Sequence, residues 1–408
     1  MDINYIRKQF PSLANSCVFM DNAGGSQVLG TVIIRINEYF LNYNVQLGAS
    51  YEISALAGQK LSQVTEKLAA FINADNPKEL IIGPSSTMLL RILSLCISRQ
   101  WKPGDEVIVT NADHEANVSC WTDLREMGIV IKIWKLNPEN LELDLKQLKE
   151  LMSPKTKLVA MVHVSNILGT INPVKEVAKI VHETSALLCV DGVAYAPHRL
   201  VDVKELDVDF YVLSTYKVYG PHQAIMYGRL DLLMEMDGLN HYFVSKEDVP
   251  YKFQPGNFNF ELTYSLMAIP EYFESIHNHH FPADIALPAR EKLQNAFSLI
   301  ADHEQLLSET LINYLKTKNG IRIIGYPGSE KQVRVTTISF IHERFKSDEI
   351  VEKVDKSGIG IRYGDFYAKK IIEDLGLVEK NGVVRVSMVH YNTLEELQLL
   401  INAFEKIF

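Results

Sequence analysis

The sequence predicts an α/β protein with a mostly parallel sheet, followed by a smaller α+β domain at the C-terminal end. Between residues 79 and 217, short runs of β-branched and other apolar residues alternate with segments of helical periodicity. This alternation is typical of repeated strand–helix–strand units. Beyond residue 320, three further strands and two helices form a second group. A chain of 408 residues is long enough for two domains.

The N-terminal region is predicted to begin with a short amphipathic helix within residues 1–14 that ends near Pro11. A short strand over 17–21 leads into the turn-rich segment Asn22–Ser26. Its two adjacent glycines would let the backbone approach a ligand closely, although a surface turn explains them equally well. Two helices, over 29–43 and 54–73, follow from apolar residues spaced by three and four positions.

The central region contains six predicted strands, at 79–83, 106–110, 129–134, 157–166, 186–191 and 208–213. Helices are expected from Pro84 to about Ser98, at 144–152 and at 173–184. The first of these helices opens on hydroxyl residues, including Ser85 and Ser86. Such residues can be simple N-caps. They can also bind phosphate, because the free amides and the dipole of a helix N-terminus attract anions.

The C-terminal region follows a polar, turn-rich stretch at 246–255. A long helical segment is predicted from Tyr264 to Leu315. Strands at 321–324, 333–341 and 383–389, with helices at 348–356 and 394–407, complete the smaller domain. The expected division is a large domain over 15–255, with 1–14 and 256–408 forming the small domain and connecting helices. The histidines at 277, 279 and 280 are interpreted as solvated residues of a polar turn.

Composition narrows the class of function. A net charge of -9 and the absence of a basic stripe argue against a nucleic-acid partner. The N-terminus has no apolar signal segment and no 18-residue apolar run occurs, so a membrane partner is not expected. The four cysteines show no CxxC pair or zinc spacing, which favours reduced thiols in the cytoplasm: Cys17, Cys96, Cys120 and Cys189. His114 has no second histidine nearby, so no metal site is predicted.

Lys217 stands at the mouth of a buried strand, directly after Tyr216 and three positions after Ser214. Desolvation at such a position lowers the pKa of an amine and makes it a nucleophile, although a snorkelling lysine would look the same. Asp191 ends another apolar strand 26 residues earlier. Pyridoxal phosphate needs a lysine for its Schiff base and an acid beside its pyridinium nitrogen. The pair therefore points to this cofactor.

Other polar residues occupy equivalent places in the predicted sheet. In parallel α/β sheets, ligands bind outside the carboxyl ends of the strands. Five of the candidate residues lie at those ends: Ser85, His114, Asn166, Asp191 and Ser214. This coincidence predicts an active site at that edge.

With these residues located, the chain resembles the cysteine desulfurase-like group of pyridoxal-phosphate enzymes of fold type I (aminotransferase class V). The resemblance extends from Asp21 to the C-terminal helix. It rests on four segments: Asp113–Asn117, His163–Thr170, Asp191-Gly192 and Tyr216–Pro221. It implies a seven-stranded sheet in the large domain and a homodimer with shared active sites.

The resemblance also implies a role for each site residue. Lys217 would bind the cofactor and move protons, with His114 stacked on the ring as the second catalytic residue. Asp191 would pair with the pyridinium, and Asn166 with the phenolic oxygen or the substrate carboxylate. The phosphate would be held by Ser85, Ser86, Ser214 and Tyr216, and Asn257 would reach the phosphate of the partner subunit. Arg385 would bind the α-carboxylate of the substrate as a bidentate pair, with Arg362 as a second arginine.

The chain departs from the desulfurase pattern on the substrate side. Tyr367 stands where the nucleophilic cysteine belongs, Ala194 replaces a glutamine, and the usual His-Arg pair is missing near Val45–Gly48. We therefore expect an enzyme that acts on an amino acid, namely a lyase that eliminates at Cβ, such as a C–S bond-cleaving enzyme. Three alternatives stay open: an aminotransferase or epimerase, a desulfurase using another cysteine such as Cys120, and a non-catalytic homologue that binds the cofactor.

Overall fold

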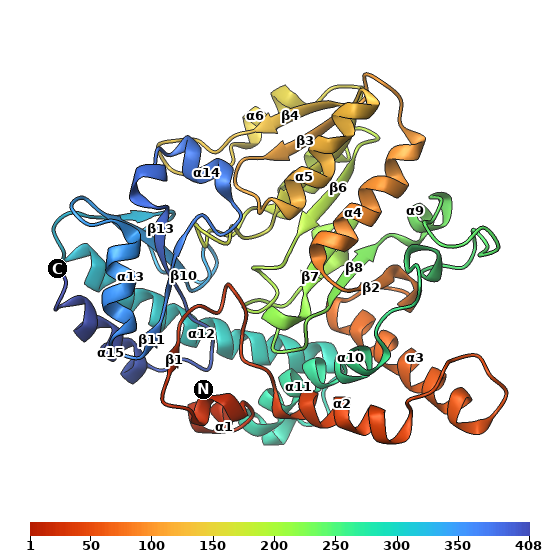
Figure 1. Cartoon of the computed structure of the whole chain (residues 1–408), viewed down its shortest axis with the longest axis horizontal. Coiled ribbons are helices and arrows are strands. Elements are labelled where there is room, and N and C mark those ends of the chain that lie inside the picture. Colours follow the sequence, from red (N-terminus) through yellow and green to blue (C-terminus); the bar gives the residue numbers. More distant parts are fainter.

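The computed structural model describes residues 1–408 and contains three sheets, of seven, four and two strands. Figure 1 shows the large sheet in orange to green on the right and the C-terminal region in blue on the left. The predicted fold class, an α/β protein with a mostly parallel seven-stranded sheet and a smaller α+β domain, is confirmed.

The large sheet has the strand order β2-β8-β7-β6-β5-β3-β4. Only β8 runs against its neighbours, being antiparallel to both β2 and β7. The sequence pattern did not reveal β8, because its run Ala-Ile-Met-Tyr-Gly holds a single β-branched residue and periodicity cannot type so short a segment. The strands are β2 (Leu80–Gly83), β3 (Glu106–Thr110), β4 (Val130–Trp134), β5 (Thr156–Val162), β6 (Leu187–Asp191), β7 (Phe210–Ser214) and β8 (Ala224–Gly228).

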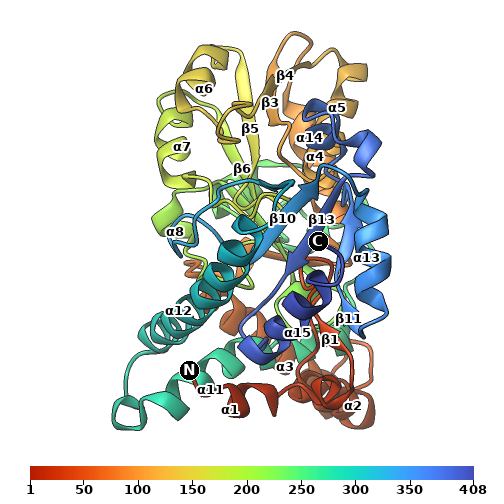
Figure 2. The ribbon, with the colours of Figure 1, turned by 90° about the vertical axis from the view of Figure 1, so that its left-hand side faces the viewer.

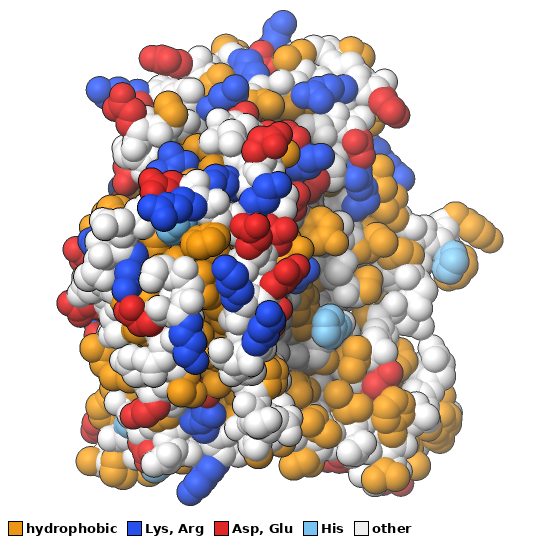
Figure 3. All heavy atoms as spheres, turned by 60° about the vertical axis from the view of Figure 1, so that its left-hand side comes forward, with side chains coloured by type: hydrophobic (Ala, Val, Ile, Leu, Met, Phe, Trp, Pro, Cys, Tyr) orange, Lys and Arg blue, Asp and Glu red, His pale blue; other side chains and the backbone are white.

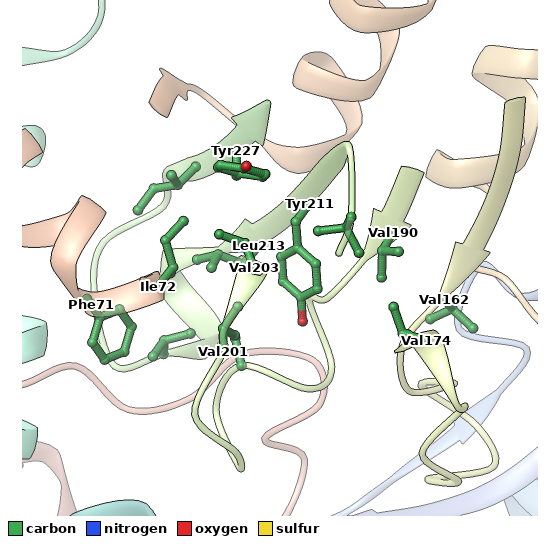
Figure 4. Packing of buried hydrophobic residues seen from close by; sticks show 14 of the residues in the cluster. Phe71, Ile72, Val162, Val174, Val190, Val201, Val203, Tyr211, Leu213 and Tyr227 are labelled. Carbon is green, nitrogen blue, oxygen red and sulfur yellow. The ribbon is translucent and has the colours of Figure 1, made fainter. Parts of the chain in front are cut away.

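Alternate side chains of these strands enter two separate hydrophobic clusters, one on each face of the sheet. Ile108 belongs to the larger cluster, whereas its neighbours Val107 and Val109 belong to the other, as the two-residue period of a strand requires. Figure 4 shows the ring of Tyr211 in the larger cluster, near Val190.

Helices cover both faces of the large sheet. The larger cluster includes residues of α2 (Gly30–Asn42), α3 (Glu52–Ile72), α7 (Val174–Val181), α11 (Ala268–His280) and α12 (Ala289–Lys316). The opposite cluster includes residues of α4 (Ser86–Ile97), α5 (Ala116–Thr122) and α9 (Leu230–Glu235). The remaining helices near the large sheet are α6 (Leu145–Leu151), α8 (Val203–Leu206) and α10 (Phe260–Ser265).

The small domain is an antiparallel sheet of order β12-β13-β10-β9. Its core also contains residues from both helices α13 (Ser347–Asp355) and α15 (Leu394–Phe404). Helix α12 contributes its first half to the large core and its second half to this one, and so ties the two together (Figure 2). The strands are β9 (Ile321–Ile324), β10 (Thr337–His342), β12 (Arg362–Gly364) and β13 (Val383–Ser387), and α14 (Lys369–Asp374) precedes β13.

Three sequence expectations need correction. The strand predicted at 333–341 begins only at Thr337, because Arg334 leaves the sheet to bridge Thr170 of the large domain. The histidines at 277, 279 and 280 lie in the last turn of α11 rather than in a turn between elements, and His277 is buried. Strand β1 (Val18–Phe19), which falls within 15–255, pairs with β11 (Ile359–Gly360) beside the small domain. The rest of the domain division stays a prediction.

The predicted N-terminal helix is the short α1 (Ile3–Arg7), followed by a 3-10 turn at Pro11–Ala14. No helix in the structure is both long and apolar enough to span a membrane. On the face shown in Figure 3, acidic and basic side chains are interspersed.

Candidate active site

Five strands of the large sheet deliver polar side chains to one edge. Strands β3, β5, β6 and β7 are parallel, and β2 runs the same way as β7 because both are antiparallel to β8. Their carboxyl ends therefore meet at the same edge. The predicted convergence of polar side chains at that edge is realised in the fold.

These side chains line a cavity that is partly open to solvent and has an empty volume of about 510 Å³. Eight of the nine predicted cofactor-binding residues lie on its wall, the exception being Asn257. The lining comprises Ser85, Ser86, Thr87, His114, Ala116, Val162, Val164, Asn166, Asp191, Val193, Ala194, Ser214, Tyr216 and Lys217.

Lys217 ends a 3-10 turn, Thr215–Lys217, that follows β7. Its side chain is buried, and its Nζ forms no hydrogen bond or ion pair within the chain. Burial lowers the pKa of Lys217 to about 8, helped by the positive charge of Arg385 and opposed by the carboxylates of Asp191 and Asp21. An unpaired buried amine with this pKa is partly neutral near pH 8 and can act as a nucleophile or a base.

Asp191 is the last residue of β6 and is buried. Its Oδ1 accepts a hydrogen bond from the backbone N–H of Val193 at 2.9 Å. Burial raises its pKa, while that hydrogen bond and Lys217 oppose the change. Space behind Asp191 is very tight, because a methyl group on Gly192 would overlap the phenol of Tyr211. The Asp191 carboxylate, held by the N–H of Val193, lines the cavity.

His114 is held by a buried network that begins at Asp113. The carboxylate of Asp113 accepts hydrogen bonds from Thr110, from Asn117 at 2.7 Å and from the N–H of Val162 at 3.1 Å. His114 Nδ1 accepts the N–H of Ala116 at 3.1 Å. Burial lowers the pKa of His114 to about 4, so the ring is neutral. A neutral, fixed imidazole can lie against the face of an aromatic cofactor.

The hydroxyl end of the cavity lies at the N-terminus of α4. Ser85 caps the helix by accepting the N–H of Met88 at 3.2 Å, and the hydroxyls of Ser86 and Ser214 are 2.7 Å apart. Tyr216 lies beside them and stacks on His222. Hydroxyls, free amides and a helix dipole together favour a phosphate at this end.

Arg385 approaches the cavity from β13 of the small domain. Its Nη1 donates to the carbonyl of Asn166 at 3.2 Å and its Nη2 donates to Asp21 at 2.7 Å. Its guanidinium lies 3.7 Å from the ring centre of Phe366. Asn166 Nδ2 donates to the carbonyl of Phe366 at 2.9 Å, which leaves Asn166 Oδ1 buried without a partner. Asn166 lines the cavity, whereas Arg385 contacts Asn166 from behind the lining residues. Arg385 Nε is also buried without a partner.

Three predicted site residues lie farther out. Arg362 and Tyr367 are at the rim. The side chain of Arg362 is 57% exposed, and Tyr367 as a whole residue is 71% exposed. The ring of Tyr367 is 5.4 Å from that of His114, and its carbonyl accepts the N–H of Glu115. Asn257 lines a different pocket beside α4, and its side chain does not reach the cavity of its own chain.

None of the four cysteines lines the cavity. Cys120, the thiol considered for the alternative of a desulfurase, is buried among apolar residues of the cluster that contains α4 and α5 and does not line the cavity. Burial raises the pKa of Cys96 to about 11 and raises those of Cys120 and Cys189 further. Cys17 is exposed beside β1.

Two residues at the site were not singled out from the sequence. Asp21 marks the start of the family resemblance, and its place directly after a predicted strand is a signal in the sequence that could have identified it. Phe366 gave no signal, because its contact with Arg385 joins positions that only the tertiary fold brings together.

Comparison with known proteins supports this picture. The aminotransferase class-V family model matches residues 18–400. The chain is 42% identical to the aminotransferase-like protein FGM3 of Gibberella zeae, covering 99% of this chain and 98% of that protein. It is 34% identical to the cysteine desulfurase-like protein ustD of Aspergillus flavus, covering 100% and 91%. Among solved structures, the cysteine desulfurase CsdA of Escherichia coli matches with a TM-score of 0.83 at 24% identity, over 100% and 98% of the two chains.

The side chains of the cavity fit pyridoxal 5'-phosphate, the cofactor of this family. The chain offers an unpaired buried amine in Lys217, a buried acid in Asp191, a neutral imidazole in His114 and hydroxyls at a helix N-terminus. Each matches one part of the cofactor, namely the aldehyde, the ring nitrogen, the ring face and the phosphate. The chain therefore belongs to the aminotransferase class-V family and is a pyridoxal-phosphate-dependent enzyme.

Proposed function

We propose that this enzyme is a lyase that breaks a bond at Cβ of an amino acid, with carbon–sulfur cleavage as the first reaction to test. One observation carries the proposal: the cavity is lined by eight of the nine predicted cofactor-binding residues but by no thiol. Tyr367 occupies the loop after Arg362, and no cysteine follows Cys189 in the sequence. A phenol cannot take up sulfur as a persulfide, whereas elimination at Cβ needs no thiol.

The bound cofactor supplies an electron sink for the charge that develops at Cα when its proton leaves. The proposed ligands are Asp191 at the ring nitrogen, His114 on the ring face, and the hydroxyls of Ser85, Ser86 and Ser214 at the phosphate. Tyr216 and Asn166 would complete its surroundings. Arg385 would bind the α-carboxylate and so orient the Cα–H bond toward Lys217.

Lys217 is the proposed base at Cα. A pKa of about 8 allows its amine to accept the proton near neutral pH. The electron pair of the Cα–H bond then forms the Cα–Cβ double bond as the leaving group departs with the electrons of its own bond to Cβ. The unsaturated product hydrolyses to a keto acid and ammonia. His114 is neutral and takes no proton in this scheme.

The proposal also includes a homodimer in which Asn257 serves the phosphate of the partner subunit. Asn257 is exposed, in the left-handed backbone region at φ 74°, and too far from its own cavity to line it. Helix α2 has four exposed apolar side chains that lie close together in the sequence: Ile33, Ile34, Phe40 and Leu41. An exposed apolar group of this kind is typical of an interface.

The reaction is tested with a panel of amino acids and S-substituted cysteines, with sulfide and keto acid measured separately. Lys217→Ala is the matched control for background chemistry of the free cofactor. Release of keto acid in equal amount to sulfide (from cysteine) or to the corresponding thiol (from an S-substituted cysteine) supports elimination. Keto acid formed only with an added keto-acid acceptor would instead identify an aminotransferase, and loss of optical activity without product would identify an epimerase.

Persulfide formation is tested separately. We expect intact-protein mass analysis after a single turnover with cysteine to show no added sulfur, because the buried thiols have raised pKa values and no thiol lines the cavity. A stoichiometric adduct that disappears in the Cys→Ser variant of one position would identify a desulfurase and refute the proposal.

A further inference from the structure

Asp21 and Arg385 form an ion pair at the place where the substrate carboxylate is proposed to bind. The Asp21 Oδ1 to Arg385 Nη2 distance is 2.7 Å. The two side chains differ in environment, since that of Arg385 is 2% exposed and that of Asp21 is 31% exposed. A buried guanidinium is costly without a counter-charge, and in the substrate-free protein Asp21 supplies it.

Asp21 occupies only half of the edge that a free carboxylate would use. A carboxylate that pairs side-on with arginine takes hydrogen bonds from Nε and Nη2 together. Asp21 bonds to Nη2 alone, and Nε is buried without any hydrogen-bond partner. Nη1 is already committed to the carbonyl of Asn166. The Nε–Nη2 edge is therefore left incomplete by the protein itself.

A second partner for Asp21 stands beside the first. Its other oxygen, Oδ2, is 3.7 Å from Nη1 of Arg362, whose side chain is 57% exposed. Gly24 leaves room there, because a methyl group at that position would lie 3.0 Å from Asp21 Oδ2. Asp21 can thus leave Arg385 and remain paired.

We propose that Asp21 is an internal carboxylate that keeps Arg385 paired in the empty enzyme and is displaced onto Arg362 by the α-carboxylate of the substrate. The inference rests on the proposed function only in taking that α-carboxylate as the ligand of Arg385. Asp21 is a positioning residue: the exchange conserves the number of ion pairs, and the buried guanidinium is never left bare. Its consequence is that every carboxylate ligand competes with Asp21.

A purely structural role for Asp21 predicts the opposite effect of removing it. If Asp21 only holds Arg385 in place, its loss should weaken carboxylate binding. If Asp21 competes with the ligand, its loss should strengthen it. The sign of the change therefore decides between the two.

The experiment measures propionate binding to the purified enzyme with its cofactor, from the rise in melting temperature with propionate concentration. Propionate has the carboxylate but no amine, so it cannot react with the cofactor. We expect Asp21→Asn to bind propionate about tenfold more tightly than the wild type, which corresponds to about 1.4 kcal/mol. Asp231→Asn is the matched control, because it removes an aspartate that also lies 2.7 Å from an arginine, Arg229, but on the surface. It should leave propionate binding unchanged.

Arg362→Gln provides an independent arm that needs no change at Asp21. It removes the alternative partner, so propionate binding should weaken severalfold, and the effect should vanish in the Asp21→Asn background. An equal weakening in both backgrounds would mean direct contact between Arg362 and the ligand, and would refute the exchange. Unchanged or weaker binding in Asp21→Asn refutes it as well, as does a propionate response that survives Arg385→Gln. An enzyme that cleaves no amino acid but passes these tests refutes the proposed reaction alone.

Discussion

Gly192 offers the sharpest test of how the fold holds Asp191. An alanine methyl at this position would overlap the phenol of Tyr211. Tyr211 is buried and its hydroxyl is 3.0 Å from His163 Nδ1. Figure 4 shows its ring among other buried apolar side chains, with Val190 of the neighbouring strand and Val203 close by. Neither the Gly192 backbone nor the Tyr211 side chain can move without disturbing the end of β6. That strand end carries Asp191, the proposed partner of the cofactor nitrogen.

The magnitude follows from two contributions. Overpacking a dense core by one methyl costs about 1–3 kcal/mol. Displacing Tyr211 also breaks its hydrogen bond to His163, which adds about 1 kcal/mol. We therefore expect Gly192→Ala to lower the free energy of unfolding by about 2–4 kcal/mol, a large part of the roughly 5–15 kcal/mol typical of folded proteins. Cofactor affinity should fall with it.

The assay is urea unfolding combined with titration of the cofactor. Gly58→Ala is the matched control, because that glycine lies within α3 and no atom outside its own helix stands within 4 Å of the added methyl. It should raise stability by about 0.5–1 kcal/mol. Tyr211→Leu combined with Gly192→Ala should cost less than the sum of the two single changes, because the smaller side chain makes room. Additive costs, or a Gly192→Ala protein as stable as the wild type, would refute the packing argument.

Three further predictions follow from the site. Lys217→Ala should abolish both the visible absorbance of the bound cofactor and the trapping of the cofactor by borohydride. Lys246→Ala, which changes an exposed lysine, should retain both. Covalently bound cofactor in Lys217→Ala would disprove the assignment. Covalent attachment of the cofactor to the cofactor-free protein should quicken as pH rises through about 8, because a lysine of that pKa is about one-tenth neutral at pH 7 and nine-tenths at pH 9; a rate independent of pH would contradict this. Sedimentation should show a dimer, and an obligate interface of this kind buries more than roughly 2,000 Å². Asn257→Asp should weaken cofactor binding about tenfold by placing a negative charge near the phosphate; a fully active monomer would rule the shared site out.

The sequence alone predicted the features that depend on local pattern. Apolar runs of strand length revealed six of the seven strands in the large sheet, and the polar residues that follow them were recognisable as one edge. Lys217 and Asp191 could be proposed together because parallel strands carry their ends to the same side. Strand β8 was not predicted, because its short apolar run shows no clear two-residue alternation.

Only the tertiary structure decided the features that join distant parts of the chain. The pair of Asp21 with Arg385 spans 364 positions, and the hydrogen bond from Asn166 to Phe366 spans 200. Neither leaves a trace in local periodicity. Cys120 is a further example. It is close to His114 in the sequence, but helix α5 directs its side chain into the apolar cluster that contains α4 and α5 and not into the cavity. Successive side chains of a helix point in different directions, because one turn takes 3.6 residues. The packing of α5 against α4, rather than the sequence near Cys120, therefore determined the direction of the Cys120 side chain.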